Sequence, residues 1–317
     1  MRLYRSIEFS RLAFLIDNIH NKVWLDLEAD SRKKIKYSNW WLRRDNALKK
    51  NQMIKNVAAD SRLFFEKSVD FNSKVGGRFN PAKSYGAIYS SSSPTLSMLE
   101  VLYHLFDSSL VLYKNLKRSS DKLTSSFNVP VPEKIEVLIV ALEFEVLDSS
   151  SVFDVCKDSS AFRKTCKDLG FYRYMGEGFD EDFIFGNDYE ITNIMGCSFH
   201  KSNKEILKSP SARISLDHFR FGRNNIVIPE NMINKLQPEL TGRFREYVCT
   251  MNMNEVLGKH SISVKAIGSS EIAKKIFLQS SPSKSNGRIK SFSQIDDSDN
   301  SQKKYIREVR LQRFVHD

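Results

Sequence analysis

The amino-acid sequence predicts an α+β fold, because strand and helix signals are mixed within its central part. Residues 134–146 (KIEVLIVALEFEV) are rich in β-forming residues and nearly alternate in polarity at their end, which indicates a strand. Residues 225–229 (NIVIP) form a second, shorter apolar run. Residues 94–106 instead repeat apolar residues at helical spacing. Both element types therefore belong to one central domain, residues 61–231.

Residues 1–60 are predicted to form a helical N-terminal extension. Four apolar residues there recur at the i, i+3, i+4 and i+7 positions of a helix face: Leu12, Leu15, Ile16 and Ile19. The three tryptophans of the chain also lie in this extension: Trp24, Trp40 and Trp41. So much aromatic surface must pack on something. We expect it to cover part of the central domain, with a partner protein as the alternative.

The central domain begins with a candidate short strand at residues 86–90 (GAIYS). A helix should follow from Pro94 to about Phe106, because Ser93 is a good N-cap and proline suits the first helical position. One face of this helix is apolar, through Leu96, Leu99, Tyr103 and Phe106. The strands at 134–146 and 225–229 complete the domain.

The remaining residues are predicted to form a helical C-terminal extension over 232–278. Its helices are expected around residues 231–236, 241–257 and 271–277. Residues 279–302 are rich in Ser, Asn, Asp and Lys and poor in apolar residues, which is typical of a flexible linker or loop. Residues 303–317 regain apolar side chains and are expected to form a short C-terminal helix.

The composition is that of a soluble globular protein, with 41% hydrophobic and 27% charged residues. No apolar run approaches the roughly 20 residues that cross a bilayer. The N-terminus also lacks the apolar length and small-residue cleavage site of a secretory signal. We therefore expect the protein to act in the cytoplasm, with delivery as a secreted effector as the alternative.

Excess positive charge lies at both ends of the chain. Residues 1–60 and 232–317 each carry a net charge of +6, whereas residues 61–231 carry −1. Such ends suit an acidic partner, a membrane surface or nucleic acid, or are simply solvated. Nucleic acid is not favoured, since the sequence matches no nucleic-acid-binding module.

The cysteines and histidines give no sign of a metal site. The four cysteines include no CxxC pair and the six histidines no HExxH motif. Cys197 and His200 have C-x-x-H spacing, but no second ligand pair lies near them. We interpret the cysteines as buried free thiols and expect no metal and no cofactor.

The most informative segment runs from residue 76 to residue 105 (GGRFNPAKSYGAIYSSSSPTLSMLEVLYHL). Its two glycines let the backbone bend close to a ligand, and the guanidinium of Arg78 suits phosphate oxygens. Tyr89 follows near the end of the predicted strand, and Glu100 lies in the predicted helix. A carboxylate beside a buried helix face is costly unless it is paired or faces a cleft. Each residue alone also fits a structural role, and only the combination indicates an active site.

This segment resembles the signature of the RES family, NAD-degrading toxins that are usually encoded beside a helix-turn-helix antitoxin. The signature combines GGRW-N, a strand that ends in Tyr and a helix that carries Glu; here Phe79 replaces the Trp. A second landmark is similar to SPSARISLDHFRFGRNNIVIP, with Ser211 at the motif serine. Just before it, YEITNIMG resembles the helix that precedes this motif in the family. The early arginine of the family is matched by Arg62. The resemblance covers roughly residues 61–231, with an insertion at about 147–188.

The resemblance implies a fold similar to ADP-ribosyltransferases, with a split mixed β-sheet and flanking helices. It also implies cleavage of the nicotinamide–ribose bond of NAD, which would be a substrate and not a cofactor. Glu100 would stabilise the ribosyl cation, Arg78 would bind the pyrophosphate and Tyr89 would contact the nicotinamide end. Ser211 and Arg62 would complete the NAD site.

Several functions remain open at this point. Water, inorganic phosphate or a protein side chain as acceptor would give an NAD glycohydrolase, a phosphorylase or a mono-ADP-ribosyltransferase. The alternative from another class is an inactive RES-like binding module with basic ends. If an antitoxin or immunity protein exists, we expect it to cover the NAD cleft.

Overall fold

The structure is a computed structural model of the 317-residue chain. It describes residues 1–9, 11–12, 47–122, 133–155, 189–202, 204–209, 211, 224–256, 259–266, 274–280 and 289–295.

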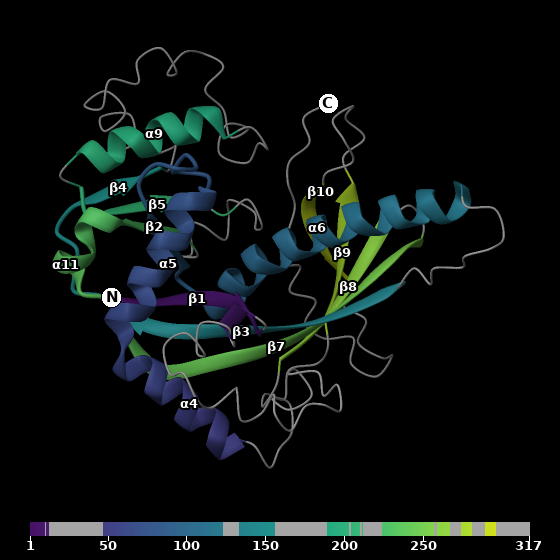
Figure 1. The fold of residues 1–317 in the computed structure, drawn as a ribbon, viewed down its shortest axis with the longest axis horizontal. Helices are drawn as coiled ribbons and strands as arrows, with labels where there is room; N and C mark the ends of the chain where they lie inside the picture. The colour runs from purple at the N-terminus through teal and green to yellow at the C-terminus, as the bar shows by residue number, and fades with distance from the viewer. Residues whose placement is uncertain are drawn as a thin grey trace.

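A ten-stranded sheet organises these residues, in the order β10-β9-β8-β7-β3-β1-β2-β6-β5-β4 (Figure 1). Pairing is antiparallel throughout, except that β4 runs parallel to β5. The mixed sheet and its flanking helices confirm the predicted α+β fold class. The strands are β1 (Arg2–Glu8), β2 (Ala87–Ser91), β3 (Lys134–Glu145), β4 (Val152–Asp154), β5 (Ile206–Ser209), β6 (Asn225–Pro229), β7 (Glu239–Val256), β8 (Lys259–Ala266), β9 (Lys274–Ser280) and β10 (Ile289–Ile295).

The described helices lie on both faces of this sheet (Figure 1). They are α4 (Ala47–Ala59), α5 (Ser61–Val75), α6 (Pro94–Lys122), α9 (Glu190–Lys201) and α11 (Ile233–Leu236), with a short 3-10 turn η4 (Glu230–Met232). The predicted helix at 94–106 is confirmed and continues to Lys122. The backbone N–H of Leu96 donates to Ser93 Oγ at 3.1 Å, so Ser93 caps this helix as predicted. None of the helices in the described part of the chain is long and apolar enough to cross a membrane.

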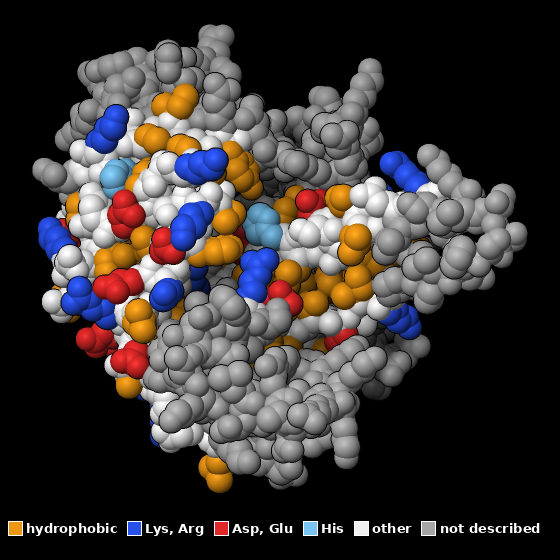
Figure 2. Space-filling view, viewed as in Figure 1, with side chains coloured by type: hydrophobic (Ala, Val, Ile, Leu, Met, Phe, Trp, Pro, Cys, Tyr) orange, Lys and Arg blue, Asp and Glu red, His pale blue; other side chains and the backbone are white. Residues whose placement is uncertain are grey.

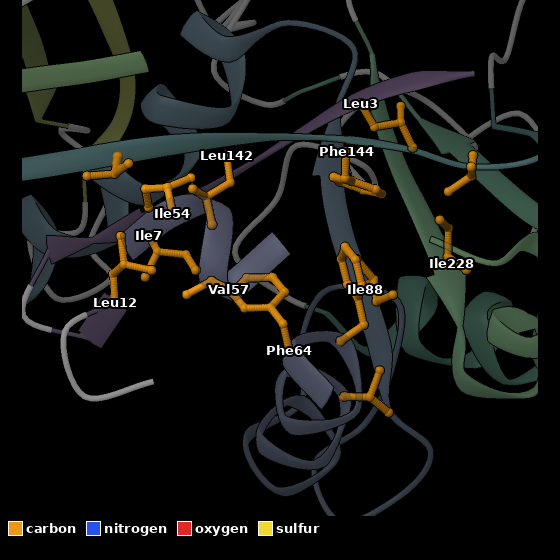
Figure 3. Packing of buried hydrophobic residues seen from close by; sticks show 14 of the residues in the cluster. Leu3, Ile7, Leu12, Ile54, Val57, Phe64, Ile88, Leu142, Phe144 and Ile228 are labelled. Carbon is orange, nitrogen blue, oxygen red and sulfur yellow. The ribbon is translucent and has the colours of Figure 1, made fainter. Parts of the chain in front are cut away.

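One face of the sheet is covered by a continuous apolar core. Leu3 and Ile7 of β1, Ile88 of β2 and Phe144 of β3 contribute to it, with Phe64 of α5 packed against them (Figure 3). Residues of β1, β2, β3 and β6 share this core, so it spans the middle of the sheet without interruption. This core therefore joins the strands on either side of β1, with β3 on one side and β2 and β6 on the other.

The opposite face carries two separate apolar cores. The first, called here the α6 core, joins α6 to β3, β7 and β8. The second, the α9 core, joins α9 to β2, β5 and β6. Between them the central strands bring polar residues into register: Ser91 lies opposite Asn225 on one side and opposite Tyr4 on the other. Directly opposed residues present their side chains on the same face. These three residues, Tyr4, Ser91 and Asn225, form a polar strip between the two cores.

The N-terminal prediction is wrong for the first residues. Arg2–Glu8 is a strand, β1, that lies between β2 and β3 at the middle of the sheet. Its apolar alternation is short and is interrupted by Arg5, which hid the strand signal. The helical prediction holds for residues 47–59, which form α4. Leu12 is buried, but the rest of the predicted stripe and the three tryptophans lie outside the described residues.

The C-terminal prediction is confirmed at residues 231–236 but wrong for the two helices that follow. Residues 239–256 form β7, not a helix over 241–257, and residues 274–280 form β9, not a helix over 271–277. Part of the predicted loop at 279–302 is strand β10. The buried side chains of β7 do alternate, but Cys, Met and Asn carry little intrinsic strand preference. Residues 303–317 and most of the predicted insertion at 147–188 lie outside the described residues.

Candidate active site

Glu100 lies in the second turn of α6 and receives hydrogen bonds from two distant segments. Ser211 Oγ donates to Glu100 Oε1 at 2.5 Å, and Asn225 Nδ2 donates to the same oxygen at 2.7 Å. Ser211 is fully buried. The structure thus joins two residues that the sequence predicted, Glu100 and Ser211, although 111 positions separate them. Hydrogen bonds to an ionised acceptor are stronger than neutral ones, so this carboxylate is firmly oriented.

Asn225 was not predicted as a site residue, and Ser91 holds its side chain in place. Ser91 Oγ donates to Asn225 Oδ1 at 2.7 Å, which turns the amide nitrogen of Asn225 toward Glu100. Ser91 ends β2 and Asn225 begins β6, opposite each other in the sheet. Sequence alone shows an asparagine before an apolar strand. Only the register of β2 and β6 shows that it contacts the carboxylate.

Arg78 is presented by a tight loop between α5 and β2. Gly76, which follows α5, has a φ angle of 77°, a conformation that favours glycine. Gly77 and Asn80 then pair as an isolated bridge that closes the loop. The guanidinium carbon of Arg78 lies 4.6 Å from the ring centroid of Tyr189, which precedes α9. A cation over an aromatic ring is attracted by its negative face, so Tyr189 fixes Arg78 beside the α9 core.

Tyr89 lies between the polar strip and the Arg78 loop. Its hydroxyl donates to Asn80 Oδ1 at 2.7 Å and accepts the backbone N–H of Phe79 at 2.8 Å. Burial raises the pKa of Tyr89, while the nearby Arg78 acts in the opposite direction. The phenol therefore stays protonated at neutral pH and serves as a hydrogen-bond donor.

Arg5 is a cation that sequence reasoning missed. It lies where β1 leaves β2, which pair only at Tyr4 and Ser91, and its Nη1 donates to the carbonyl oxygen of Tyr89 at 3.5 Å. Burial lowers the pKa of Arg5 to about 10, so the group still carries its charge at neutral pH. Among the described residues no carboxylate forms an ion pair with it. A cation held in a largely desolvated place is stabilised by a nearby anion, and an anionic ligand would supply one.

Arg62 is the early arginine that the sequence predicted for the NAD site, and the structure places it on the surface. It lies on α5 with 83% of its side chain exposed, in an i,i+4 ion pair with Glu66 at 2.8 Å. The signal that could have found Arg5 is its position: a lone arginine between Leu3 and Ile7 interrupts an otherwise apolar strand face.

The group combines the oriented carboxylate of Glu100 with the guanidinium of Arg78 on the face that carries α6 and α9. Arg5 reaches the backbone of β2 at Tyr89 from the strand face that it shares with Leu3 and Ile7. Such a site suits a substrate that is anionic at one end and develops positive charge at the other. Among the described residues no three His, Cys, Asp or Glu side chains gather in a way that could hold a metal ion.

The model of the family described as the RES domain matches residues 64–232, more than half of the chain. No curated protein matches the chain. Among solved structures, the crystal structure of the M. tuberculosis MbcT–MbcA toxin–antitoxin complex contains a similar chain, at 17% sequence identity. That similarity covers 56% of this chain and 74% of the other, with a TM-score of 0.36.

Proposed function

The chain belongs to the RES family, and on that premise we propose that it cleaves the bond between nicotinamide and ribose in NAD. The observation that carries the proposal is the carboxylate of Glu100, which Ser211 and Asn225 hold from two other segments of the chain. Two donors on one oxygen hold the carboxylate of Glu100 in a fixed orientation. They suit a carboxylate that must face a reacting centre in one orientation.

The chemistry of NAD fits the charges of the site. When the glycosidic bond breaks, its electron pair leaves with the nicotinamide, which becomes neutral, and positive charge develops on the ribose. Glu100 would stabilise that charge, as a preorganised anion does best. Arg78 and Arg5 would bind the two negative charges of the pyrophosphate. Because the leaving group departs neutral, no strong general acid is required.

The acceptor is proposed to be water or inorganic phosphate, which makes the protein an NAD glycohydrolase or phosphorylase. A mono-ADP-ribosyltransferase that modifies a protein side chain is the alternative. An enzyme of either kind would deplete or divert NAD in the cytoplasm, so we class it as toxin-like. We accordingly expect an antitoxin or immunity protein that covers the site, since blocking NAD entry is the simplest way to silence it.

The first experiment follows nicotinamide release from NAD by the purified protein, with and without phosphate. The Glu100→Gln variant should lose about 10²–10³-fold in kcat, the usual effect of removing one transition-state-stabilising group. Glu66→Gln is the matched control, because Glu66 is exposed on α5 and pairs only with Arg62 among the contacts the structure shows. Thermal unfolding of each variant verifies that the fold is kept.

The outcomes separate the proposed functions. Nicotinamide release that needs phosphate identifies a phosphorylase, and release without phosphate a glycohydrolase. Release only in the presence of protein substrates identifies the transferase. Near-normal turnover in Glu100→Gln would refute the role of Glu100. A folded protein that releases no nicotinamide under any of these conditions would favour a binding module.

A further inference from the structure

The hydroxyl of Tyr89 both donates and accepts a hydrogen bond within the protein. It donates to Asn80 Oδ1 at 2.7 Å and accepts a hydrogen bond from the backbone N–H of Phe79 at 2.8 Å. A phenol has one proton to donate, so a substrate atom could accept a hydrogen bond from Tyr89 only if the Asn80 bond broke. Both partners directly follow Arg78 in the chain.

Asn80 in turn is held from its other side. It is completely buried, and its amide nitrogen donates to Asn72 Oδ1 at 2.9 Å and to the carbonyl oxygen of Tyr85 at 3.0 Å. Asn72 Oδ1 also accepts the backbone N–H of Ala87 at 2.8 Å. The network therefore ties the end of α5, the Arg78 loop and the start of β2 into one unit. All of these buried groups have partners, which makes the unit rigid.

The glycine before Arg78 is matched to the same hydroxyl. A Cβ built on Gly77 would lie 2.7 Å from the Tyr89 hydroxyl oxygen and 2.8 Å from the ring carbon that bears it. Cβ atoms in proteins essentially never approach other atoms this closely, so a side chain at this position would force the Tyr89 ring or the loop to shift. Gly77 thus allows the loop to close onto Tyr89. Because Tyr89 belongs to β2, its hydrogen bonds to Phe79 and Asn80 anchor the loop to the sheet.

We propose that Tyr89 is a positioning residue whose hydroxyl braces the loop that presents Arg78, and that this hydroxyl does not contact the substrate. The proposal rests on the proposed function only for what Arg78 binds, the pyrophosphate of NAD. It assigns Tyr89 a different role from a direct ligand of the nicotinamide end. Its effect on catalysis must then pass entirely through Arg78.

The first test needs no enzymatic activity. Amide hydrogen exchange at Phe79 should become about 5- to 10-fold faster in Tyr89→Phe, the factor expected for the loss of one neutral hydrogen bond. Gly77→Ala, which displaces the hydroxyl and keeps the tyrosine, should do the same. Tyr4→Phe is the matched control, since it deletes a phenol hydrogen bond to Glu143 at 3.1 Å, outside the loop. Unchanged Phe79 exchange in both loop variants, with unchanged global stability, would overturn the brace.

The second test is a double-mutant cycle on NAD cleavage. Tyr89→Phe should raise KM about 10-fold with a smaller change in kcat, and it should have no further effect in the Arg78→Ala background. If the hydroxyl contacts nicotinamide, the two effects on kcat/KM multiply instead, and the proposal is wrong. Should the wild-type protein release no nicotinamide, the proposed function fails while the exchange measurement still decides whether the brace exists.

Discussion

At the scale of single residues, the site divides into side chains whose spacing could be predicted and side chains that only the sheet reveals. Arg78, Tyr89 and Glu100 lie close together in the chain and were found by their spacing, as was Ser211 by its motif. The roles of Asn225 and Arg5 depend on contacts with residues of β2 that are far away in the sequence, Ser91 and Tyr89. A single sequence does not state which strands pair, so the expectation fell on Arg62, which the structure shows on an exposed helix face.

Arg5 allows a prediction that separates function from stability. Arg5 is only partly exposed and forms no ion pair within the described residues, so its replacement by an apolar chain of similar length should keep or raise the melting temperature, by a few degrees at most. Arg5→Met should therefore stay folded while KM for NAD rises at least about tenfold. ADP-ribose should raise the melting temperature of the wild-type protein and not that of the variant. Arg62→Met is the control and should change neither property. A marked fall in the melting temperature of Arg5→Met would instead make Arg5 a structural residue.

At the scale of elements, the sequence predicted correctly the helices and strands whose residues strongly prefer that structure, and it was wrong where the preference is weak. The strands at 134–146 and 225–229 are rich in Val, Ile and Leu, and the helix from Pro94 has a capping serine and a proline at its start. In β7 the conformation is decided by tertiary structure: backbone pairing with β3 and β8 and packing against α6. Its buried residues occur at every second position: Tyr247, Cys249, Met251 and Met253. That alternation is visible in the sequence, but of these four residues only Tyr247 is of a type with a marked strand preference.

A scan along β7 would test this strand against the helix that the sequence suggested. Met251→Ala should lower the free energy of unfolding by about 2–4 kcal/mol, because Met251 is fully buried in the α6 core. Its neighbour Thr250, which is only half-buried, should tolerate Thr250→Ala with a change near 0.5 kcal/mol. Chemical denaturation measures both values. Sensitivity that repeats every three to four residues, and not every two, would contradict the strand.

At the scale of the whole molecule, the sheet extends beyond the segment that the family model matches. Residues 64–232 include β2, β3, β4, β5 and β6, whereas β1 and β7 to β10 lie outside it. Yet β1 supplies Arg5, and β7 and β8 form one wall of the core that holds α6. Basic and acidic side chains are interspersed over the described part of the face in Figure 2, and apolar side chains gather along α6.

Removal of the C-terminal strands should therefore disable the site, although no residue of the proposed site lies there. A chain that ends after Leu236 loses β7, which pairs with β3 along its whole length on the side away from β1. It also loses six buried apolar residues of the α6 core: Tyr247, Cys249, Met251, Met253, Ile262 and Val264. At roughly 1.5–3 kcal/mol for each side chain, the loss is on the order of 10 kcal/mol, as large as the stability of a typical domain. A chain that ends after Gly268 keeps β7 and β8, so it should keep α6 and Glu100 in place. Cooperative thermal unfolding and nicotinamide release should both survive in the longer truncation and disappear in the shorter one. A folded, active chain that ends at Leu236 would restore the boundary near residue 231 that the sequence predicted, and it would show that α6 holds Glu100 without the strands beyond it.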